Sequence, residues 1–488
     1  MVIESLKYKI LQQFGFAPTQ EQGQALDTFV SFLTDRDPQA VMILRGSAGT
    51  GKTSLSGAIV RTLLQIRQKV MLLAPTGRAA KVFSLGSGAP AYTIHRRIYR
   101  EKAFAGVDGQ FGLNDNLYTD TLFMVDEASM IANMGLGGTT FGSGCLLDDL
   151  VKFVYQGHND RLLLIGDKAQ LPPVGEEESP ALSASVMEGY GLKVYECDLN
   201  EVLRQSQSSG ILYNATLIRQ MITHDAVTGL PLIRFKGFAD IVMMPGAELV
   251  ESLGDSYHHV GMDETMVITR SNKRANIYNN GIRNMVLDRE EELSSGDMLM
   301  IVKNNYFWTE KEKKESGEGS AGAVPAFLAN GDRAKVLRVS NYIELYGFRF
   351  ATLLLQLPDY DDYEMQVTGM LDTLQSESPA LTHEQQEELF RQVEEDYQHF
   401  VPLKADRMKS IRQDAYFNAL QIKYAYAVTC HKAQGGQWAH VYVDQGYMTD
   451  DMLTPDYIHW LYTAFTRATD KLFLVNWPKE QTCEPTDL

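Results

Sequence analysis

Short apolar runs alternate with longer amphipathic stretches along the first part of the chain. The segments VMILR (41–45), TLFMV (121–125) and RLLLI (161–165) are almost continuously apolar. Runs of this length are typical of strands that are buried on both faces of a parallel sheet. A helix-permissive stretch, SLSGAIVRTLLQ, follows the first run after a short loop. The alternation predicts an α/β domain with parallel strands and crossover helices over about residues 1–215.

A second pattern of this kind begins near Met266 and resumes near Leu420. The sequence in between contains a lysine- and glutamate-rich loop and then VLRV, NYIELYGFRFATLLLQL and YEMQV, which have the composition of strands. We therefore expect a second α/β domain that carries a small inserted β-barrel. The predicted domains are 1–85 with 119–215, 216–334 with 418–488, and 335–417 for the barrel and an acidic arm.

Residues 86–118 interrupt the first domain and are predicted to contain a β-hairpin. Within AFAGVDGQFGL, the pair Asp108-Gly109 is a strong signal for a tight turn. With that pair at the turn centre, Phe104 lies opposite Leu113, and both share one face of the hairpin with Phe111. Two interpretations stay open: this face packs on the α/β domain, or an aromatic ring stays free to contact a ligand.

The segment GSAGTGKT directly after the first apolar run fits the pattern G-x-x-x-x-G-K-[ST] at every fixed position. In a strand–loop–helix context, the glycines let backbone N–H groups point at phosphate oxygens. Lys52 would neutralise the terminal phosphates, and the Thr53 hydroxyl would bind Mg²⁺. The predicted nucleotide-binding residues of this loop are Gly46, Ser47, Ala48, Gly49, Thr50, Gly51, Lys52 and Thr53.

Polar residues also follow two other predicted strands. Asp126 and Glu127 end the second apolar run, where a carboxylate could reach a metal ion beside the phosphate loop. We expect Asp126 to bind Mg²⁺ and Glu127 to act as the base that orients or deprotonates water. Gln170, just after the third strand, is placed to sense a terminal phosphate.

The segment APTQEQGQAL leaves two roles open for Gln22. Thr19 followed by Gln22 is the pattern of a helix capping box. Gln22 could also contact an adenine base from the same capped helix. The two roles are compatible, so we keep Gln22 among the nucleotide-binding candidates.

The net charge of −17 lowers the expectation of a nucleic-acid partner without excluding it. Twelve acidic residues and one basic residue lie between Asp359 and Asp396, whereas six basic residues and one acid lie between Arg78 and Lys102. Salt screens exposed charges beyond about 10 Å, so a local basic surface can still bind phosphates. The four separated cysteines and the lack of a long apolar run predict a cytoplasmic protein without a membrane partner.

Eight short motifs, in order, resemble those of superfamily 1B DNA helicases of the RecD-like and phage Dda-like branch. Besides the phosphate loop, VDEASM and GDKAQLPPVG, they include APTGRAAK and TIH near residues 74–95. LNEVLRQS (199–206), YAYAVTCHKAQGGQ (424–437) and YTAFTRATDKL (462–472) complete the series. The resemblance covers about Thr19 to Val475 and implies two RecA-like motor domains, a hairpin insertion and an SH3-like barrel.

The resemblance also implies roles for individual residues. Arg204 and Arg467 would reach the terminal phosphate, with Arg467 acting as an arginine finger from the second domain, on a helix. Gly435 would contribute to the nucleotide site. The implied DNA contacts are Thr76, His95, Asn272, Thr429 and His431, with Phe104 and Phe111 as separation-pin candidates.

The implied function is an ATP-dependent DNA helicase that moves 5′ to 3′ on single-stranded DNA and uses Mg²⁺. The implied partners are single-stranded and forked DNA, with a single-strand-binding, replication or repair protein as a further candidate, and the implied state is a monomer. Two alternatives stay open: an ATPase that remodels protein–DNA complexes without unwinding, and an RNA helicase. A phosphotransferase of small molecules is disfavoured because it would not need the motifs of the second domain.

Overall fold

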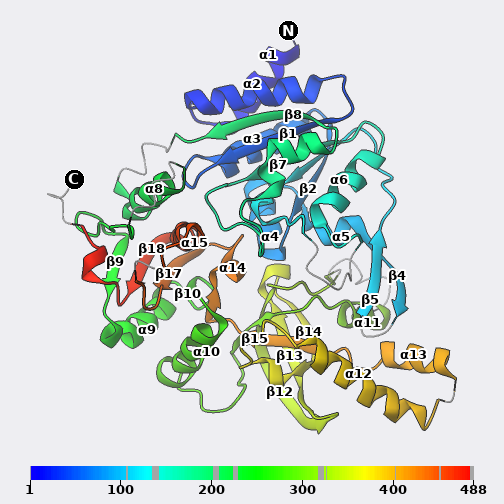
Figure 1. The fold of residues 1–488 in the computed structure, drawn as a ribbon. Coiled ribbons are helices and arrows are strands. Elements are labelled where there is room, and N and C mark those ends of the chain that lie inside the picture. The colour runs from blue at the N-terminus through cyan, green and yellow to red at the C-terminus, as the bar shows by residue number, and fades with distance from the viewer. Residues whose placement is uncertain are drawn as a thin grey trace.

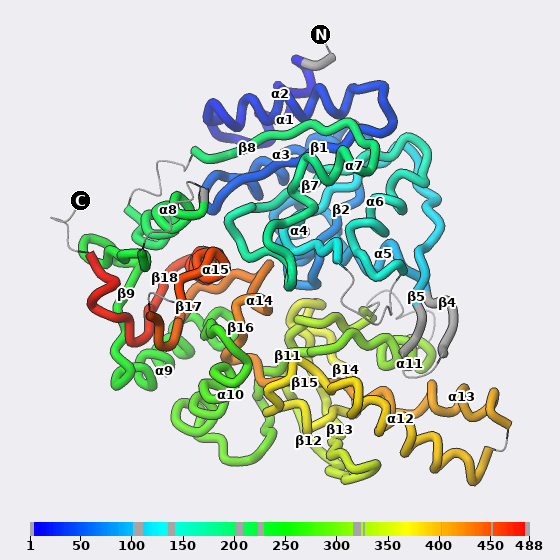
Figure 2. The backbone as a smooth tube through the Cα atoms, in the orientation of Figure 1, coloured from blue at the N-terminus to red at the C-terminus, as the bar shows by residue number. Residues whose placement is uncertain are grey.

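The computed structural model describes residues 2–105, 108–134, 142–201, 208–223, 229–316, 324–325, 327–401, 403–449 and 452–483. Two parallel sheets and a closed barrel organise these residues (Figure 1). Helices cover the two sheets, and the barrel lies beside both of them (Figure 2). The two-sheet α/β architecture and the small barrel that the sequence predicts are therefore confirmed.

The first sheet has six strands in the order β3-β2-β6-β7-β1-β8, and all neighbouring pairs are parallel. Apolar side chains on both faces of the sheet are buried under helices, as the continuous apolar runs require. The strands are β1 (Ala40–Gly46), β2 (Lys69–Ala74), β3 (Ala91–Thr93), β6 (Thr121–Val125), β7 (Arg161–Gly166) and β8 (Lys193–Leu199). The helices are α1 (Val2–Phe14), α2 (Gln20–Thr34), α3 (Lys52–Gln65), α4 (Gly77–Ser87), α5 (Ile94–Ile98), α6 (Leu146–Gln156) and α7 (Ala184–Gly189).

The second sheet has five strands in the order β16-β10-β17-β18-β9, again all parallel. Its strands are β9 (Ile241–Met244), β10 (Thr265–Thr269), β16 (Ala427–Thr429), β17 (Trp438–Asp444) and β18 (Ala468–Val475). Its helices are α8 (Gly210–Thr223), α9 (Leu249–His259), α10 (Asn272–Gly281), α14 (Cys430–Ala433) and α15 (Pro455–Phe465). Helix α8 packs on α15 and shares the core of this sheet, so the boundary predicted at residue 215 falls inside α8.

The barrel closes through β11 (Met298–Ile301), β12 (Arg333–Leu345), β13 (Phe348–Leu357), β14 (Tyr363–Met370) and β15 (Leu420–Tyr424). Its first and last strands lie outside the predicted segment 335–417, because closure uses one short strand from each flank. Four neighbouring pairs of the barrel are antiparallel, namely β11–β12, β12–β13, β13–β14 and β11–β15, and β14 pairs in parallel with β15. Helix α11 (Phe307–Ser316) lies between β11 and β12 in the chain.

The acidic tract forms an arm on the barrel, as predicted. The arm consists of α12 (His383–Gln398), which starts with a Thr382–Gln385 capping box, and of α13 (Lys404–Arg412). Leu389, Val393 and Ile411 pack against barrel residues such as Phe350. The described residues also include short helical turns: η1 (Ala128–Met130), η2 (Pro180–Leu182), η4 (Gly246–Glu248), η5 (Ile282–Val286), η6 (Pro358–Tyr360), η7 (Leu371–Thr373) and η9 (Lys479–Gln481).

A two-stranded hairpin of β4 (Tyr99–Ala105) and β5 (Asp108–Leu113) extends from the first domain. The predicted register is wrong: Phe104 pairs with Gly109, and Leu113 pairs with Tyr99. Asp108 already belongs to a strand and pairs with Ala105, so the connection is 106–107, which lies outside the described residues. A β-bulge between Glu101 and Ala103 shifts the pairing further.

Candidate active site between the two parallel sheets

The phosphate loop joins the carboxyl end of β1 to the start of α3, as the strand–loop–helix pattern predicts. Gly49 and Gly51 have φ values of 78° and 81°, in the left-handed region that glycine adopts without strain. A Cβ at Gly46 would lie 2.8 Å from Lys52 Cγ, so a side chain there would displace the lysine. The Lys52 ammonium donates hydrogen bonds to the carbonyls of Gly46 and Ser47.

Gln22 of α2 contacts the phosphate loop. Its side-chain oxygen accepts a hydrogen bond from Thr19 N at 3.0 Å, which completes the predicted capping box. Its amide nitrogen donates to the Thr50 carbonyl at 2.9 Å, and the side chain is buried. The capping role is therefore confirmed, and the second contact shapes the phosphate loop.

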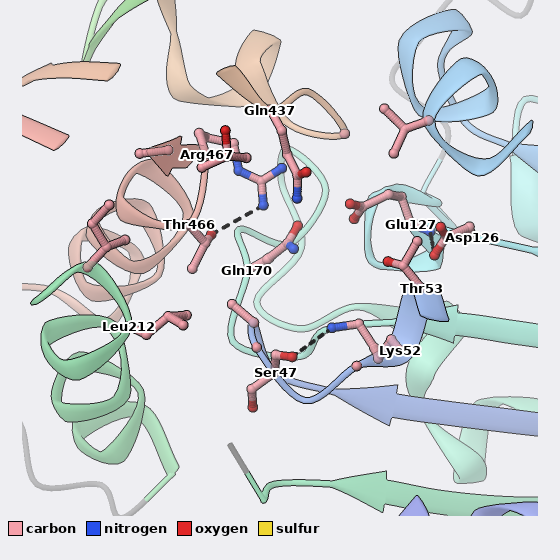
Figure 3. A pocket seen from close by; sticks show the side chains of 18 of the residues that line it. Ser47, Lys52, Thr53, Asp126, Glu127, Gln170, Leu212, Gln437, Thr466 and Arg467 are labelled. Atoms are coloured by element: carbon pink, nitrogen blue, oxygen red, sulfur yellow. Dashed lines mark hydrogen bonds between the residues drawn. The ribbon is translucent and has the colours of Figure 1, made fainter. Parts of the chain in front are cut away.

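Asp126 and Glu127 lie at the carboxyl end of β6, beside the phosphate loop (Figure 3). Glu127 has φ 52°, a left-handed conformation that is costly for a residue with a side chain and that is concentrated at functional sites. Asp126 Oδ1 accepts a hydrogen bond from Glu127 N at 2.9 Å. Burial, and then the neighbouring Glu127 carboxylate, raise the pKa of Asp126 to about 7.

The oxygen donors here fit Mg²⁺, which keeps several waters and binds few protein carboxylates when substrate phosphates complete its shell. Thr53 and Asp126 both line the cleft and offer a hydroxyl and a carboxylate. No cluster of three or more histidine, cysteine or acidic side chains suited to hold a metal by itself occurs among the described residues. A metal at this place would therefore depend on phosphate oxygens and water.

Replacing Asp126 by asparagine should make the metal-free protein more stable at pH 8. Because the pKa of Asp126 is raised to about 7, the folded state binds protons more tightly than the unfolded state. Stability therefore falls as the pH rises from about 4 to about 7, and the variant avoids this loss. We expect its melting temperature in EDTA to exceed the parent's by about 2 °C or more at pH 8, and the gap to narrow at pH 5. An equal gap at both pH values would contradict this assignment.

Gln170 connects the two walls of the site. It lies in the loop after β7, and in the amide orientation that satisfies both neighbours its nitrogen donates to Glu127 Oε2 at 3.3 Å while its oxygen accepts from Arg467 Nη2 at 3.1 Å. Figure 3 shows Gln170 between these two side chains. One residue of the first domain thus touches both the candidate base and the arginine of the second domain.

The sequence predicts Arg467 on a helix, but it lies in the short connection between α15 and β18, two residues after the end of α15. Its guanidinium is buried and donates to the carbonyls of Thr463 and Gly436 at 3.1 Å each. A further bond goes to Thr466 Oγ1 at 3.2 Å. These bonds fix a planar cation at the edge of the cleft, facing the phosphate loop.

Two contacts to the phosphate loop are not predicted from the sequence. Arg219 of α8 donates to Ser47 Oγ, and the Tyr462 hydroxyl of α15 accepts from Ala48 N at 3.0 Å. Both residues belong to the second domain by their packing. No local pattern around either residue marks it as a partner of a loop so far away in sequence.

These residues enclose a cleft of about 410 Å³ between the two sheets (Figure 3). Its walls include most of the predicted site: Ser47, Ala48, Gly49, Gly51, Lys52, Thr53, Asp126, Glu127, Gln170, Gly435 and Arg467. Gly46, Thr50 and Gln22 support the loop from outside the cleft wall. Arg204 lies outside the described residues.

Four of the predicted DNA contacts lie at or just after the ends of β2, β3 and β16: Thr76, His95, Thr429 and His431. Thr76 caps α4, where its hydroxyl accepts from Ala79 N at 3.2 Å, and Thr429 occupies the same position before α14. A Cβ at Gly435 would lie 3.2 Å from Thr76 Oγ1, so the two domains meet at this point. Burial lowers the pKa of His95 to about 4 and also lowers that of His431. Both imidazoles are thus neutral near pH 7.

Asn272 begins α10, and its amide donates to the Glu377 carbonyl at 3.1 Å. Asn276 similarly donates to the carbonyls of Gln375 and Ser376, at 2.8 and 3.1 Å. The loop from the barrel thus covers this end of α10. A phosphate contact by Asn272 would have to replace the bond to Glu377.

Phe111 packs against the protein. Its ring centroid lies 4.6 Å from that of Tyr306, which in turn stacks on Phe327 at 4.6 Å. Phe111 and Leu113 also contact the core of the first domain. This favours the packing interpretation for Phe111, whereas the side chain of Phe104 lies outside the described residues.

Two family models match the chain, one for each wall of the cleft. A model described as an AAA domain matches residues 17–229, and one described as a UvrD-like helicase C-terminal domain matches residues 424–475. The first contains the phosphate loop, Asp126 and Gln170, and the second contains Gly435 and Arg467. Both matches therefore include residues that line the cleft, and the second model is that of a helicase domain.

Similar proteins cover the chain to different extents. An uncharacterized protein of Acanthamoeba polyphaga mimivirus is 22% identical and covers 90% of the chain and 96% of its own length. The ATP-dependent RecD2 DNA helicase of Deinococcus radiodurans is 30% identical over 32% of the chain, which spans 18% of that protein. An uncharacterized protein of Methanocaldococcus jannaschii is 33% identical over 32% of the chain and 13% of its own length.

One solved structure that is similar to this chain is that of a Pif1 helicase from Bacteroides in complex with ADP-AlF3 and ssDNA. It has a TM-score of 0.46 and 13% identity, and the alignment covers 96% of this chain and 95% of that one. Within the described residues, none of the helices has the length and apolar character that crossing a membrane requires.

Proposed function

We propose that the chain is a DNA motor that couples hydrolysis of Mg-ATP to 5′-to-3′ movement on single-stranded DNA and to separation of duplex DNA. The observation that carries the proposal is the cleft itself. It holds the phosphate loop and Glu127 on one wall and Arg467 on the other, with Gln170 bonded to both sides. A nucleotide bound there would touch both α/β domains.

The chemistry assigned to each residue follows from its place in the cleft. Lys52 and the loop N–H groups would bind the phosphates, with Gln22 and Gly435 completing the nucleotide site. Glu127 would take a proton from a water molecule while the oxygen of that water bonds to the terminal phosphorus. The bond between this phosphorus and the oxygen of ADP breaks in the same step. Arg467, together with Arg204, would balance charge on the transferred group.

Mg²⁺, when bound through Thr53 and Asp126, would polarise the terminal phosphate and neutralise part of its charge. Burial raises the pKa of Asp126, so a bound cation would be needed to stabilise its ionised form. Gln170 would orient water and hold Arg467 at the same time. This double contact would make the chemical step sensitive to the separation of the domains.

Movement would come from alternate opening and closing of the cleft. Thr76 and His95 on the first domain, and Thr429, His431 and Asn272 on the second, would hold the sugar–phosphate backbone in turn. Short polar and neutral donors suit this task because they bind the backbone without reading bases. The track would then run along the strand ends of both sheets, next to the barrel.

The β4–β5 hairpin is the proposed separation element, with Phe104 as the candidate for contact with the last base pair. Phe111 would support the hairpin through its stack on Tyr306. We further propose four units: a first motor domain, this hairpin, a second motor domain that begins with α8, and an SH3-like barrel that carries the arm. A single-strand-binding or a repair protein remains a candidate partner for that arm.

The test uses duplexes with a 5′ or a 3′ single-stranded tail, in DNA and in RNA, with ATP and Mg²⁺. We expect strand separation of 5′-tailed DNA at a rate at least about tenfold above that of 3′-tailed DNA. Preference for the 3′ tail would contradict the direction but leave a helicase. ATP hydrolysis with DNA but without strand separation would favour the remodelling ATPase, and preference for RNA tails would favour the RNA helicase.

A further inference from the structure

The hydroxyl of Tyr462 bonds to two loops of the opposite domain at once. Tyr462 lies on α15 of the second domain and is almost completely buried. Its oxygen accepts from Ala48 N of the phosphate loop at 3.0 Å and donates to Asp167 Oδ2 at 2.6 Å. Asp167 begins the loop that carries Gln170, and its other oxygen accepts from Ala169 N at 3.0 Å.

The second domain holds this loop, residues 167–171, at three further points. Thr463, next to Tyr462, accepts from Leu171 N at 2.8 Å. His459 of the same helix lies with Nδ1 2.9 Å from the Ala169 carbonyl, and Gln434 donates to the Leu171 carbonyl at 2.7 Å. Four contacts thus tie this loop of the first domain to the second domain.

The Gln434 contact also links the loop 167–171 to α14, which carries a candidate DNA contact. Gln434 directly follows α14, whose residues include His431, a candidate contact to the DNA backbone. A shift of α14 would act on Leu171 through Gln434, while α15 acts on Asp167 through Tyr462. Gln170 lies between these two anchors and bonds to Glu127 and Arg467.

We propose that Tyr462 is a positioning residue that sets Gln170 and the phosphate loop against Arg467 when the two domains close. The inference rests on the proposed function, because it assumes that ATP is hydrolysed in this cleft. In this role Tyr462 contacts the nucleotide site only through Ala48 N of the phosphate loop and takes no part in the chemical step itself. It transmits domain closure through its hydroxyl, so the phenolic oxygen and not the ring carries the effect.

The decisive variant is Tyr462→Phe, which keeps the ring and removes the oxygen. Ala48 N–H and the buried Asp167 carboxylate each lose one partner. We expect the DNA-stimulated kcat for ATP hydrolysis to fall roughly 10- to 100-fold, as the loss of a hydrogen bond to a charged group implies. The KM for ATP should stay within about twofold, because Lys52 and the loop N–H groups other than that of Ala48 keep their surroundings.

The matched control is Tyr457→Phe on the same helix. Tyr457 is also buried, and its hydroxyl donates to Gln445, away from both loops. Equal losses of activity in the two variants would mean that α15 needs its hydroxyls for folding alone, which would overturn the inference. A raised KM with an unchanged kcat in Tyr462→Phe would also overturn it.

Asp167→Asn keeps the inference testable if Tyr462→Phe folds poorly. It leaves the Tyr462 bond to Ala48 N in place. It replaces one of the two Asp167 oxygens, which accept from Tyr462 and from Ala169 N, by an NH2 group that cannot accept. We expect Asp167→Asn to lower kcat by a similar factor. In the variant that combines Tyr462→Phe with Asp167→Asn, kcat should fall by less than the product of the two single factors. Parent-like hydrolysis in Asp167→Asn would refute the positioning role. If the parent protein itself hydrolyses no ATP in the presence of single-stranded DNA, the proposed function fails instead.

Discussion

Alanine at Lys52 is expected to abolish measurable ATP hydrolysis, a loss of at least about 1,000-fold. Among the described residues that line the cleft, Lys52 is the only lysine. Its ammonium already lies against the carbonyls of Gly46 and Ser47, at the end of the loop where α3 begins. No neighbouring lysine could take over the charge on the phosphates. Phosphate release with saturating single-stranded DNA measures the effect.

Two comparison variants make this result specific. Lys69→Ala removes an exposed lysine that bonds to Thr119 at the opposite end of β2, and it should hydrolyse ATP like the parent. Glu127→Gln should still bind Mg-ATP but turn over at least about 100-fold more slowly, the usual scale for a general base. Full hydrolysis by the Lys52 variant would refute the motor interpretation.

The phosphate loop and the two carboxylates are predictable from sequence because each is contained in one continuous segment. An apolar run gives the strand, and the residues that follow it must lie at the carboxyl edge of a parallel sheet. Gly46 to Thr53, Asp126 and Gln170 all have this local context, and the structure places them around one cleft. Here the local pattern and the global fold lead to the same arrangement.

Contacts between the two domains are not predictable in this way. Tyr462 and Ala48 are 414 residues apart, and Arg219 and Ser47 are 172 apart. Their contacts depend on how the two sheets face each other, which no periodicity in a single segment reports. The resemblance to a helicase family suggested Arg467 but gave no reason to single out Arg219 or Tyr462.

The barrel and the hairpin show how local signals can mislead. The barrel strands MLMI and LQIKY are short apolar runs that suit a parallel sheet equally well, so the sequence places them in the second domain. In the hairpin, the Asp108-Gly109 pair is a good turn signal, yet Asp108 is already paired with Ala105. The bulge near Lys102 absorbs the difference in strand length, and a bulge has no signal here.

Arg467 is the residue through which the second domain would act on the chemistry directly. Its guanidinium is held by three bonds from within its own domain, to Thr463, Gly436 and Thr466, and by one to Gln170 across the cleft. A planar cation fixed in this way costs little reorganisation when charge develops on a transferred phosphoryl group. Lysine cannot reproduce this geometry because it lacks the planar set of donors.

Replacing Arg467 by alanine is expected to lower kcat by about 1,000-fold or more while Mg-ATP still binds, since arginine fingers contribute on this scale. Arg467→Lys should recover only a small part of the rate. Because the side chain is buried, thermal unfolding must accompany the kinetics, and Lys471→Ala on the exposed start of β18 serves as the control for the strand. Binding of a fluorescent ATP analogue and single-turnover hydrolysis separate the two effects. If affinity for the nucleotide falls as far as kcat/KM, or if kcat stays near that of the parent, Arg467 holds the domains together and does not stabilise the transition state.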